Sequence, residues 1–254
     1  MTHCSANWNR QAVDQLLANV PVHHLKARPS GARLVKRSDV EVCARLALAK
    51  KTKADGPDDV GWKFLEENFA VVVSMVMTFL SSSFDKRFAF DRFSIPKRNG
   101  GRRMLANFGF LNGIMLAAIN RALRRHYDCL LYGPSVLPRL YSSCPAIADA
   151  IAEAVGGGLT GWVKSDVTDA FGSINHEMLM HIASRLMPRA DDVQLLRAVI
   201  EQNYAVEPDR GDRPGVGMPQ GNPVSGFSLE VCLSPLLFTL HLRFQAKLIL
   251  YVDD

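Results

Sequence analysis

Two short apolar runs that each end in aspartate constrain the fold of this chain more than any other feature of its sequence. Residues 161–165 (GWVKS) lead into Asp166, and residues 248–252 (LILYV) lead into Asp253 and Asp254. Runs of this length and composition predict β-strands. Carboxylates at the ends of buried strands are costly unless they bind cations. The sequence therefore predicts two strands whose ends present acids to a metal site.

The chain between these two strands contains a turn followed by a long helix. Residues 217–226 read GMPQGNPVSG, in which Asn222 is expected to cap a helix that Pro223 opens. Pro235 is expected to kink this helix, because proline removes a backbone hydrogen-bond donor. The apolar residues of the helix recur at helical spacing and are Leu229, Leu233, Leu236, Leu240 and Phe244.

Several other segments also show helical patterns. Residues 69–80 predict a buried helix that is too short to cross a bilayer, and residues 192–203 predict a further helix. Pro145 is expected to open a helix over 146–155 that the glycines at 156–158 end. One more helix combines an apolar stripe with arginines that face elsewhere: Leu111, Met115, Ala118 and Ala122, with Arg121, Arg124 and Arg125.

Asn175 is expected to cap a helix that contains two histidines. Residues His176 and His181 are five apart, whereas two zinc ligands on one helix face need a spacing of four. We therefore expect both histidines on the surface. The core-facing residues of this helix are expected to be Leu179, Ile182, Ala183 and Leu186.

In order and spacing, these segments resemble the conserved motifs of reverse transcriptases. Residues 166–171 (DVTDAF) resemble motif A, residues 219–225 (PQGNPVS) motif B, and residues 251–254 (YVDD) motif C. Residues 93–103 (FSIPKRNGGRR) resemble the fingers motif of the bacterial branch that holds group II intron, retron and phage-defence enzymes. Motif B departs from the commoner pattern, because Ser225 is followed by Gly226 rather than proline. The resemblance covers about residues 88–254.

The resemblance implies an α+β fold with the fingers and palm of a right-hand polymerase. In such a fold an antiparallel palm sheet packs on helices. The implied divisions are a mainly helical basic region at 1–87, fingers at 88–160 and an incomplete palm at 161–254. Because the sequence stops at Asp254, we expect the thumb to be absent and the chain to be a fragment. Alone, such a fragment is expected to bind nucleic acid weakly and to be inactive or weakly active.

The implied activity is RNA-directed DNA synthesis, in which dNTPs are added to a primer 3′-hydroxyl. Asp166 and Asp253 are expected to bridge two Mg²⁺ ions, for which Mn²⁺ could substitute, with Asp254 as an accessory ligand. Asp169 is expected to act through its backbone near the triphosphate, outside the metal set. The expected nucleotide-binding residues are Lys97, Arg103, Phe171, Gln220 and Gly221.

Each of these roles has an alternative. Phe171, the expected steric gate against a 2′-hydroxyl, could be an ordinary core residue, and Gln220 with Gly221 could form a plain hairpin turn. A template-independent or RNA-synthesising polymerase would use the same chemistry. A catalytically silent nucleic-acid-binding module is the alternative from another class. The expected partners are an RNA template, a primer or RNA–DNA hybrid, and dNTPs.

The composition fits a soluble protein with a polyanionic partner. The chain has 254 residues, 48% of them hydrophobic and 22% charged, with a net charge of +5 and a pI near 9.0. Basic residues between His23 and Arg37 fit a solvated linker or a nucleic-acid surface. The five cysteines lack a CxxC pair and no secretory signal precedes them. We expect a cytoplasmic protein without membrane contact.

Overall fold

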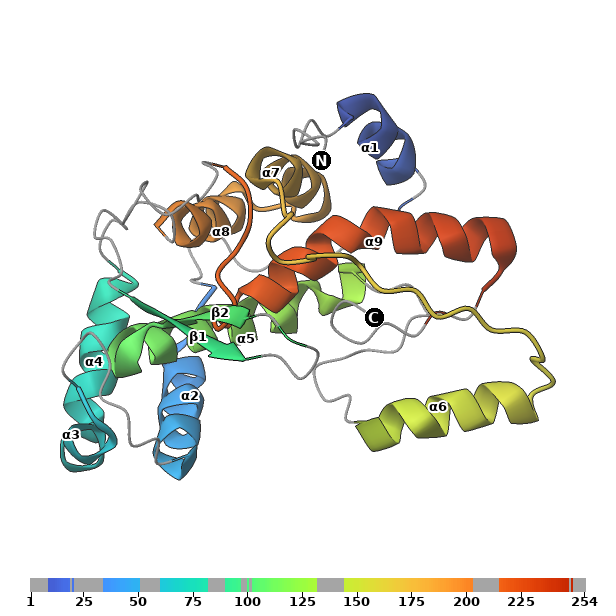
Figure 1. Ribbon diagram of the computed structural model, residues 1–254. Helices are drawn as coiled ribbons and strands as arrows, with labels where there is room; N and C mark the ends of the chain where they lie inside the picture. The colour runs from blue at the N-terminus through green and yellow to red at the C-terminus, as the bar shows by residue number, and fades with distance from the viewer. Residues whose placement is uncertain are drawn as a thin grey trace.

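The computed structural model describes the chain at residues 9–18, 20, 34–50, 60–81, 90–96, 100, 102–131, 144–202, 215–246 and 248. Helices dominate these ranges, together with one antiparallel hairpin (Figure 1). In chain order the elements are α1 (Arg10–Leu17), α2 (Arg37–Lys50), α3 (Trp62–Glu67), α4 (Phe69–Phe79), β1 (Asp91–Pro96), β2 (Arg102–Asn107), α5 (Gly109–Leu131), α6 (Cys144–Gly156), α7 (His176–Leu186), α8 (Ala190–Gln202) and α9 (Ser225–Phe244). The architecture is α+β, as predicted.

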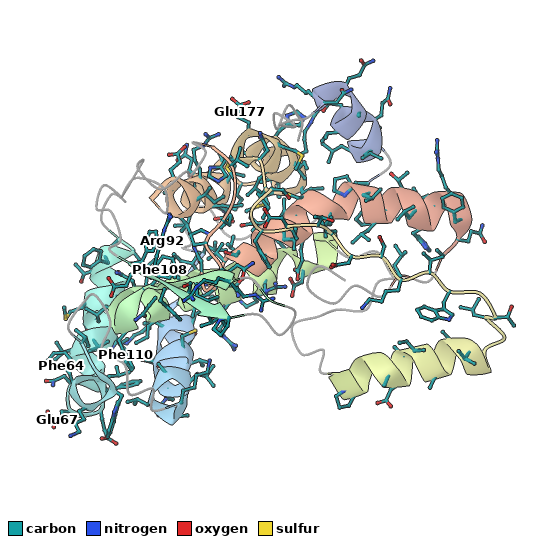
Figure 2. The ribbon with its side chains drawn as sticks, viewed as in Figure 1. Phe64, Glu67, Arg92, Phe108, Phe110 and Glu177 are labelled. Atoms are coloured by element: carbon teal, nitrogen blue, oxygen red, sulfur yellow. The ribbon has the colours of Figure 1, made fainter. Side chains whose placement is uncertain are left out.

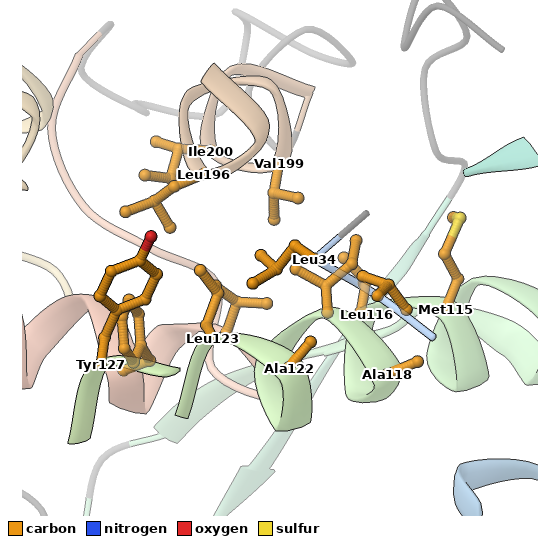
Figure 3. Close-up of a cluster of buried hydrophobic side chains, with 14 of the residues drawn as sticks. Leu34, Met115, Leu116, Ala118, Ala122, Leu123, Tyr127, Leu196, Val199 and Ile200 are labelled. Carbon is orange, nitrogen blue, oxygen red and sulfur yellow. The ribbon is translucent and has the colours of Figure 1, made fainter. Parts of the chain in front are cut away.

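Helix α5 lies at the centre of the fold. Figure 1 shows α2, α3 and α4 on one side of it and α7 and α8 on the other, with α9 crossing between. The predicted apolar stripe of α5 is buried at Met115, Ala118 and Ala122. Figure 3 shows Leu123 of α5 directed toward Leu196 of α8. Burial of these side chains joins the N-terminal helices and the C-terminal helices into one core.

Polar side chains of α5 also reach buried carboxylates on neighbouring helices. Asp39 of α2 is only 2% exposed, and its Oδ1 lies 3.5 Å from Nε of Arg121 and accepts a hydrogen bond from Arg125. The Tyr127 hydroxyl donates to the buried carboxylate of Asp192 on α8. Because a buried charge is stable only when it is paired, these contacts fix α2 and α8 against α5.

The hairpin of β1 and β2 corresponds to the predicted fingers motif. Its antiparallel register pairs Phe93 with Leu105 and Ile95 with Arg103. Phe93 and Ile95 are 46% and 39% exposed, whereas Ala106 on β2 is buried. Opposed residues share one face of a sheet, so Arg103 lies on the exposed face with the two apolar side chains. The turn between the strands includes Gly100, whose φ of +81° suits glycine.

The strand predicted at residues 161–165 is not formed. Residues 161–167 have no regular secondary structure and pair with no strand in the described part of the chain. Trp162 and Val163 are 84% and 93% exposed. A β-strand needs a hydrogen-bonded neighbour, and the other predicted strand, at 248–252, lies outside the described residues except for Leu248. The prediction of a buried strand at 161–165 was therefore wrong.

Helices α6, α7 and α8 follow the sequence predictions closely. Helix α6 includes Pro145 near its start and ends at Gly156, and it lies apart from the other helices in Figure 1. The Asn175 side chain caps α7 by accepting a hydrogen bond from the Met178 amide at 2.9 Å. The predicted core positions of α7 are all buried: Leu179, Ile182, Ala183 and Leu186.

The two histidines of α7 are not open surface residues, so that prediction was wrong. His176 and His181 are both partly buried, and each has a hydrogen-bond partner. His181 Nε2 lies 2.6 Å from Oδ1 of Asp14, which links α7 to α1. This hydrogen bond lowers the pKa of Asp14. Distant segments supply both partners, so local spacing could not reveal them.

Helix α9 begins later than predicted and buries a different face. Its cap is Val224 rather than Asn222, whose side-chain oxygen accepts a hydrogen bond from the Val224 amide at 2.8 Å. Leu229 of the predicted stripe is buried, but Leu236 and Phe244 are 44% and 70% exposed. In the second half of the helix the buried positions are instead Ser234, Pro235, Phe238 and Thr239.

Among the described helices, α9 alone is long and apolar enough to meet the length and composition criteria for a membrane span. Over an 18-residue stretch of this helix the mean hydropathy is 1.3, and 56% of that stretch is buried inside the fold. The core helix of a soluble protein has the same properties. The finding is therefore weak evidence for membrane insertion.

Candidate active site

Backbone hydrogen bonds join the predicted motif A turn to the segment that precedes motif B. The Met218 amide donates to the Phe171 carbonyl at 2.7 Å, and the Gly217 amide donates to the Ile174 carbonyl at 2.6 Å. Asn175 forms an isolated antiparallel bridge with Val216. Main-chain contacts of this kind place Phe171 directly beside the approach to motif B. Phe171 itself is partly buried against the core.

The motif B turn in turn lies on strand β2. The Ala106 amide donates a hydrogen bond of 2.7 Å to the Gln220 carbonyl. Gly221 has a φ of +107°, and a Cβ added there would lie 2.4 Å from the Ala106 carbonyl oxygen. Only glycine fits, because it accepts this φ and leaves room for the neighbouring backbone. The turn is thus packed on β2 and is not a free hairpin turn.

Side chains around the turn hold it against the start of α9. The Ser225 hydroxyl donates to the Pro219 carbonyl at 3.0 Å, closing the turn across its base. The Asn222 carboxamide oxygen accepts from the Val224 amide. Met218, Asn222, Val224 and Ser225 are all buried. These contacts make the turn a compact structure between β2 and α9.

One residue that sequence reasoning misplaced, His176, supports the same junction. Its Nε2 donates to the Gly217 carbonyl at 2.7 Å. Burial lowers the pKa of His176, although the bond to Gly217 and the charge of Glu201 oppose that effect. Ala106 was also missed, because its contribution is a backbone N–H, which every residue other than proline possesses.

The fingers hairpin presents cationic side chains near this junction. Arg103 lies on the same strand as Ala106 and its side chain is exposed. Arg102 donates from Nε to the Ser94 hydroxyl at 2.7 Å, which holds it across the hairpin. Figure 2 labels Arg92, which belongs to β1, and Phe108, which follows β2, and the Arg92 guanidinium lies 5.4 Å from the ring centre of Phe90. Lys97, the other predicted triphosphate ligand, lies outside the described residues.

Of the three predicted metal ligands, the described residues include Asp166 alone. Asp166 is exposed, and within the described ranges its carboxylate makes no ion pair or hydrogen bond. Asp253 and Asp254 lie outside the described residues. Among the residues that are described, no three His, Cys, Asp or Glu side chains cluster as metal ligands would. Asp166 is thus free to coordinate a cation, and hard carboxylate oxygens suit Mg²⁺.

Asp169, which the resemblance places outside the metal set, has a distinct conformation. Its φ of +48° is left-handed, which is uncommon for a residue other than glycine but tolerated by Asp and Asn. Its carboxylate packs against Gly172, where an added Cβ would lie 2.4 Å from Oδ2. The Asp169 carbonyl accepts a hydrogen bond from the Ser173 amide at 2.9 Å. This residue therefore shapes the turn between Asp166 and Phe171.

The structure brings together three of the segments that the sequence singled out. Phe171 is joined to motif B through Met218, and Gln220 and Gly221 are joined to β2, the strand of Arg103. Asp166 belongs to the same motif as Phe171 but precedes it on the segment without regular secondary structure. The candidate site is therefore an intact junction of motif A, motif B and fingers, with one exposed carboxylate adjoining it along the chain.

The solved structures that are similar to this chain include two that each match it with a TM-score of 0.47 and 18% sequence identity. One is described as "Partial Cas6-RT-Cas1--Cas2 complex", and the match covers 91% of this chain and 35% of that chain. The other is described as "Cas6-RT-Cas1--Cas2 complex", with 91% and 22% covered. This chain thus spans about a third or less of either one. No curated protein matches its sequence.

A family comparison is more informative. Residues 95–254 match the family described as "Reverse transcriptase (RNA-dependent DNA polymerase)". The matched region begins in the fingers hairpin and includes every predicted motif from Lys97 to Asp254. Because that region is more than half of the chain, this protein belongs to the reverse transcriptase family.

Proposed function

We propose that this protein is an RNA-directed DNA polymerase that adds dNTPs to a primer 3′-hydroxyl. The observation that carries the proposal is the backbone junction of the candidate site. Hydrogen bonds from Met218 to Phe171 and from Ala106 to Gln220 link motif A, motif B and the fingers strand. A polymerase needs these three elements around one nucleotide, because catalysis of phosphoryl transfer depends mainly on positioning and on electrostatic stabilisation.

The proposed metal ligands are Asp166, Asp253 and Asp254. The exposed and unpaired carboxylate of Asp166 fits a hard divalent cation, Mg²⁺ or Mn²⁺. When bound, two such ions would stabilise both the attacking 3′-hydroxyl oxygen and the leaving oxygen. The contribution of the protein is to hold Asp166 next to a turn that its own backbone bonds have fixed.

The proposed nucleotide ligands come from both sides of the junction. Arg103 and Lys97 would neutralise the triphosphate, for which a forked guanidinium and a compact ammonium are well suited. Phe171 would lie beneath the sugar and disfavour a 2′-hydroxyl. Gln220 and Gly221 would line the base-pair side of the site. We further propose that residues 88–160 act as fingers and residues 161–254 as an incomplete palm, preceded by a mainly helical basic region at 1–87.

A primer-extension assay tests this proposal and separates it from its alternatives. The protein expressed from its natural reading frame is given a primed RNA template, dNTPs and Mg²⁺ or Mn²⁺. We expect template-directed DNA products that disappear when the metal is chelated. Extension without template would indicate a template-independent relative, and extension with ribonucleotides alone an RNA-synthesising one. Binding of the primed template with no extension under any metal would show a silent binding module and overturn the proposal.

A further inference from the structure

A buried ion pair links the central helix α5 to the helix that follows motif B. Arg124 Nη1 lies 2.7 Å from Glu230 Oε2, and Nη2 lies 3.1 Å from Oε1. The two side chains are only 12% and 6% exposed. Arg124 Nη1 also lies 3.5 Å from Asp128 on its own helix. The contact with Glu230 is a two-pronged pair, the geometry in which a guanidinium binds a carboxylate most strongly.

A buried pair of this kind is a poor source of stability. Removing two charges from water is costly, and apolar side chains of similar size often stabilise a core at least as well. Neighbouring positions on α9 are in fact apolar or small, including Phe227, Val231 and Ser234. What a two-pronged ion pair provides, and an apolar contact does not, is a fixed position of one helix relative to the other.

The position that this pair fixes is the start of α9. The Arg124 guanidinium passes over Gly226, where an added Cβ would lie 3.5 Å from Nη2. Gly226 is also the residue at which this chain departs from the commoner motif B pattern. Helix α9 starts at Ser225, whose hydroxyl closes the motif B turn through Pro219. Glu230 lies in the second turn of α9, so the ion pair holds the start of the helix into which the motif B turn leads.

The other end of the same turn is attached to the fingers. The Ala106 amide bonds to the Gln220 carbonyl, and β2 leads directly into α5. Strand β2, helix α5, helix α9 and the turn thus form a closed loop of contacts. Two bonds close it, Ala106 to Gln220 and Arg124 to Glu230. If the Arg124–Glu230 pair is changed, either the hydrogen bond between Ala106 and Gln220 or the position of α9 relative to α5 must change.

We propose that Arg124 and Glu230 are positioning residues. They set the distance between the motif B turn and strand β2, and so set the affinity for the incoming nucleotide. This inference rests on the proposed function, because nucleotide binding at Gln220 and Gly221 is part of it. Neither residue touches substrate. Their effect passes through the first turn of α9 to the Gln220 carbonyl.

The decisive variant is Glu230→Gln, with Glu41→Gln as its matched control. Glu41 forms an exposed pair with Arg37 on α2, in which the side chains are 37% and 53% exposed. We expect Glu230→Gln to raise the KM for dNTP by about tenfold with a smaller change in kcat per active site, because a misplaced binding group costs affinity. Glu41→Gln should leave both constants unchanged, as exposed pairs contribute little.

Amide hydrogen exchange gives a second measurement that does not depend on activity. The Ala106 amide should lose protection in Glu230→Gln and keep it in Glu41→Gln. If the wild-type protein extends no primer, the proposed function fails, but this measurement still decides whether the ion pair controls the turn. Unchanged protection of Ala106 in Glu230→Gln would overturn the inference, as would an unchanged KM in an active enzyme.

If Glu230→Gln does not fold, a third variant still tests the inference. The double change Arg124→Met with Glu230→Met replaces the pair by apolar side chains and should remain folded. It should show the same rise in KM and the same loss of Ala106 protection, because it lacks a fixed geometry. A folded double variant with wild-type KM and wild-type protection would show that the pair is only structural.

Discussion

Two neighbouring regions of the molecule, the junction of motif A with motif B and the segment that leads into motif A, are held in very different ways. Residues 171–176 are joined to residues 215–218 by main-chain hydrogen bonds and by the His176 side chain. Residues 161–167, which carry Asp166, have no ladder partner in the described part of the chain, and Trp162 and Val163 are exposed. The difference shows that main-chain hydrogen bonds of the described fold build the junction between motif A and motif B, whereas they leave the segment that carries Asp166 exposed.

A pair of glycine substitutions should give the largest difference in stability between these two parts. Gly221→Ala would force an L-residue into a φ of +107° and bring its Cβ to 2.4 Å from the Ala106 carbonyl oxygen. We expect a loss of on the order of 3 kcal/mol in the free energy of unfolding. Gly161→Ala meets nothing within 4 Å and should change it by less than about 0.5 kcal/mol.

Urea denaturation of the two glycine variants measures this contrast. Equal losses in both would mean that residues 161–167 are packed as tightly as the junction. A neutral Gly221→Ala would mean that the motif B turn does not lie against β2. Either result would show that the two regions do not differ as described.

Two valine truncations sharpen the same contrast with one chemical change. Val224 at the motif B turn is fully buried, whereas Val163 is 93% exposed. We expect Val224→Ala to cost about 2 kcal/mol, because it removes buried methyl groups and leaves a cavity. Val163→Ala should cost less than about 0.5 kcal/mol. A large loss for Val163→Ala in thermal unfolding would show that this residue is covered in solution.

A change at Phe171 tests whether the junction side of motif A faces the nucleotide sugar. Phe171→Val should relieve a clash with the 2′-hydroxyl and raise ribonucleotide use relative to deoxynucleotide use by about tenfold. The quantity to measure is the ratio of kcat/KM for the two nucleotides. Phe244→Val, at a 70% exposed site on α9, serves as the control. An unchanged ratio in Phe171→Val would assign this ring to the core alone.

The smallest expected effect is a dependence of the free energy of unfolding on pH, with a slope that arises from the titration of His176. Burial lowers the pKa of His176 in the folded protein below its ordinary value of 6.5, so the unfolded chain binds the proton first. The stability that neutral His176 contributes is present above pH 6.5 and is lost as the pH falls toward the folded-state pKa. His176→Gln should remove this slope, as measured by unfolding at a series of pH values. An identical slope in both proteins would contradict the assignment.

The sequence predicted the helices well because their signals are local. The Asn175 cap, the Pro145 start and the glycines after α6 act within a turn or two of the chain. The α+β class and the reverse transcriptase family were also predicted correctly, the family from motifs in order. The start of α9 was placed too early, because Asn222 bonds to Val224 inside a turn and does not cap the helix.

What could not be predicted depends on distant partners. Nothing in the sequence shows that Gly221 lies on Ala106, or that His176 bonds to Gly217, because these contacts join segments far apart in the chain. The strand at 161–165 failed for a similar reason. An apolar pattern specifies extended backbone, whereas burial requires a neighbouring strand. The roles of the individual site residues stay predictions.

The central claim is that Asp166 supplies a metal-binding carboxylate to a polymerase site, and primer extension by two matched variants tests it most directly. Asp166→Asn and Asp169→Asn make the same chemical change on one motif, and asparagine tolerates the φ of +48° at position 169. We expect Asp166→Asn to lower RNA-templated extension with Mg²⁺ on the order of a thousandfold, and Asp169→Asn to stay within about tenfold of wild type. Extension by folded Asp166→Asn at a rate near wild type would contradict the claim.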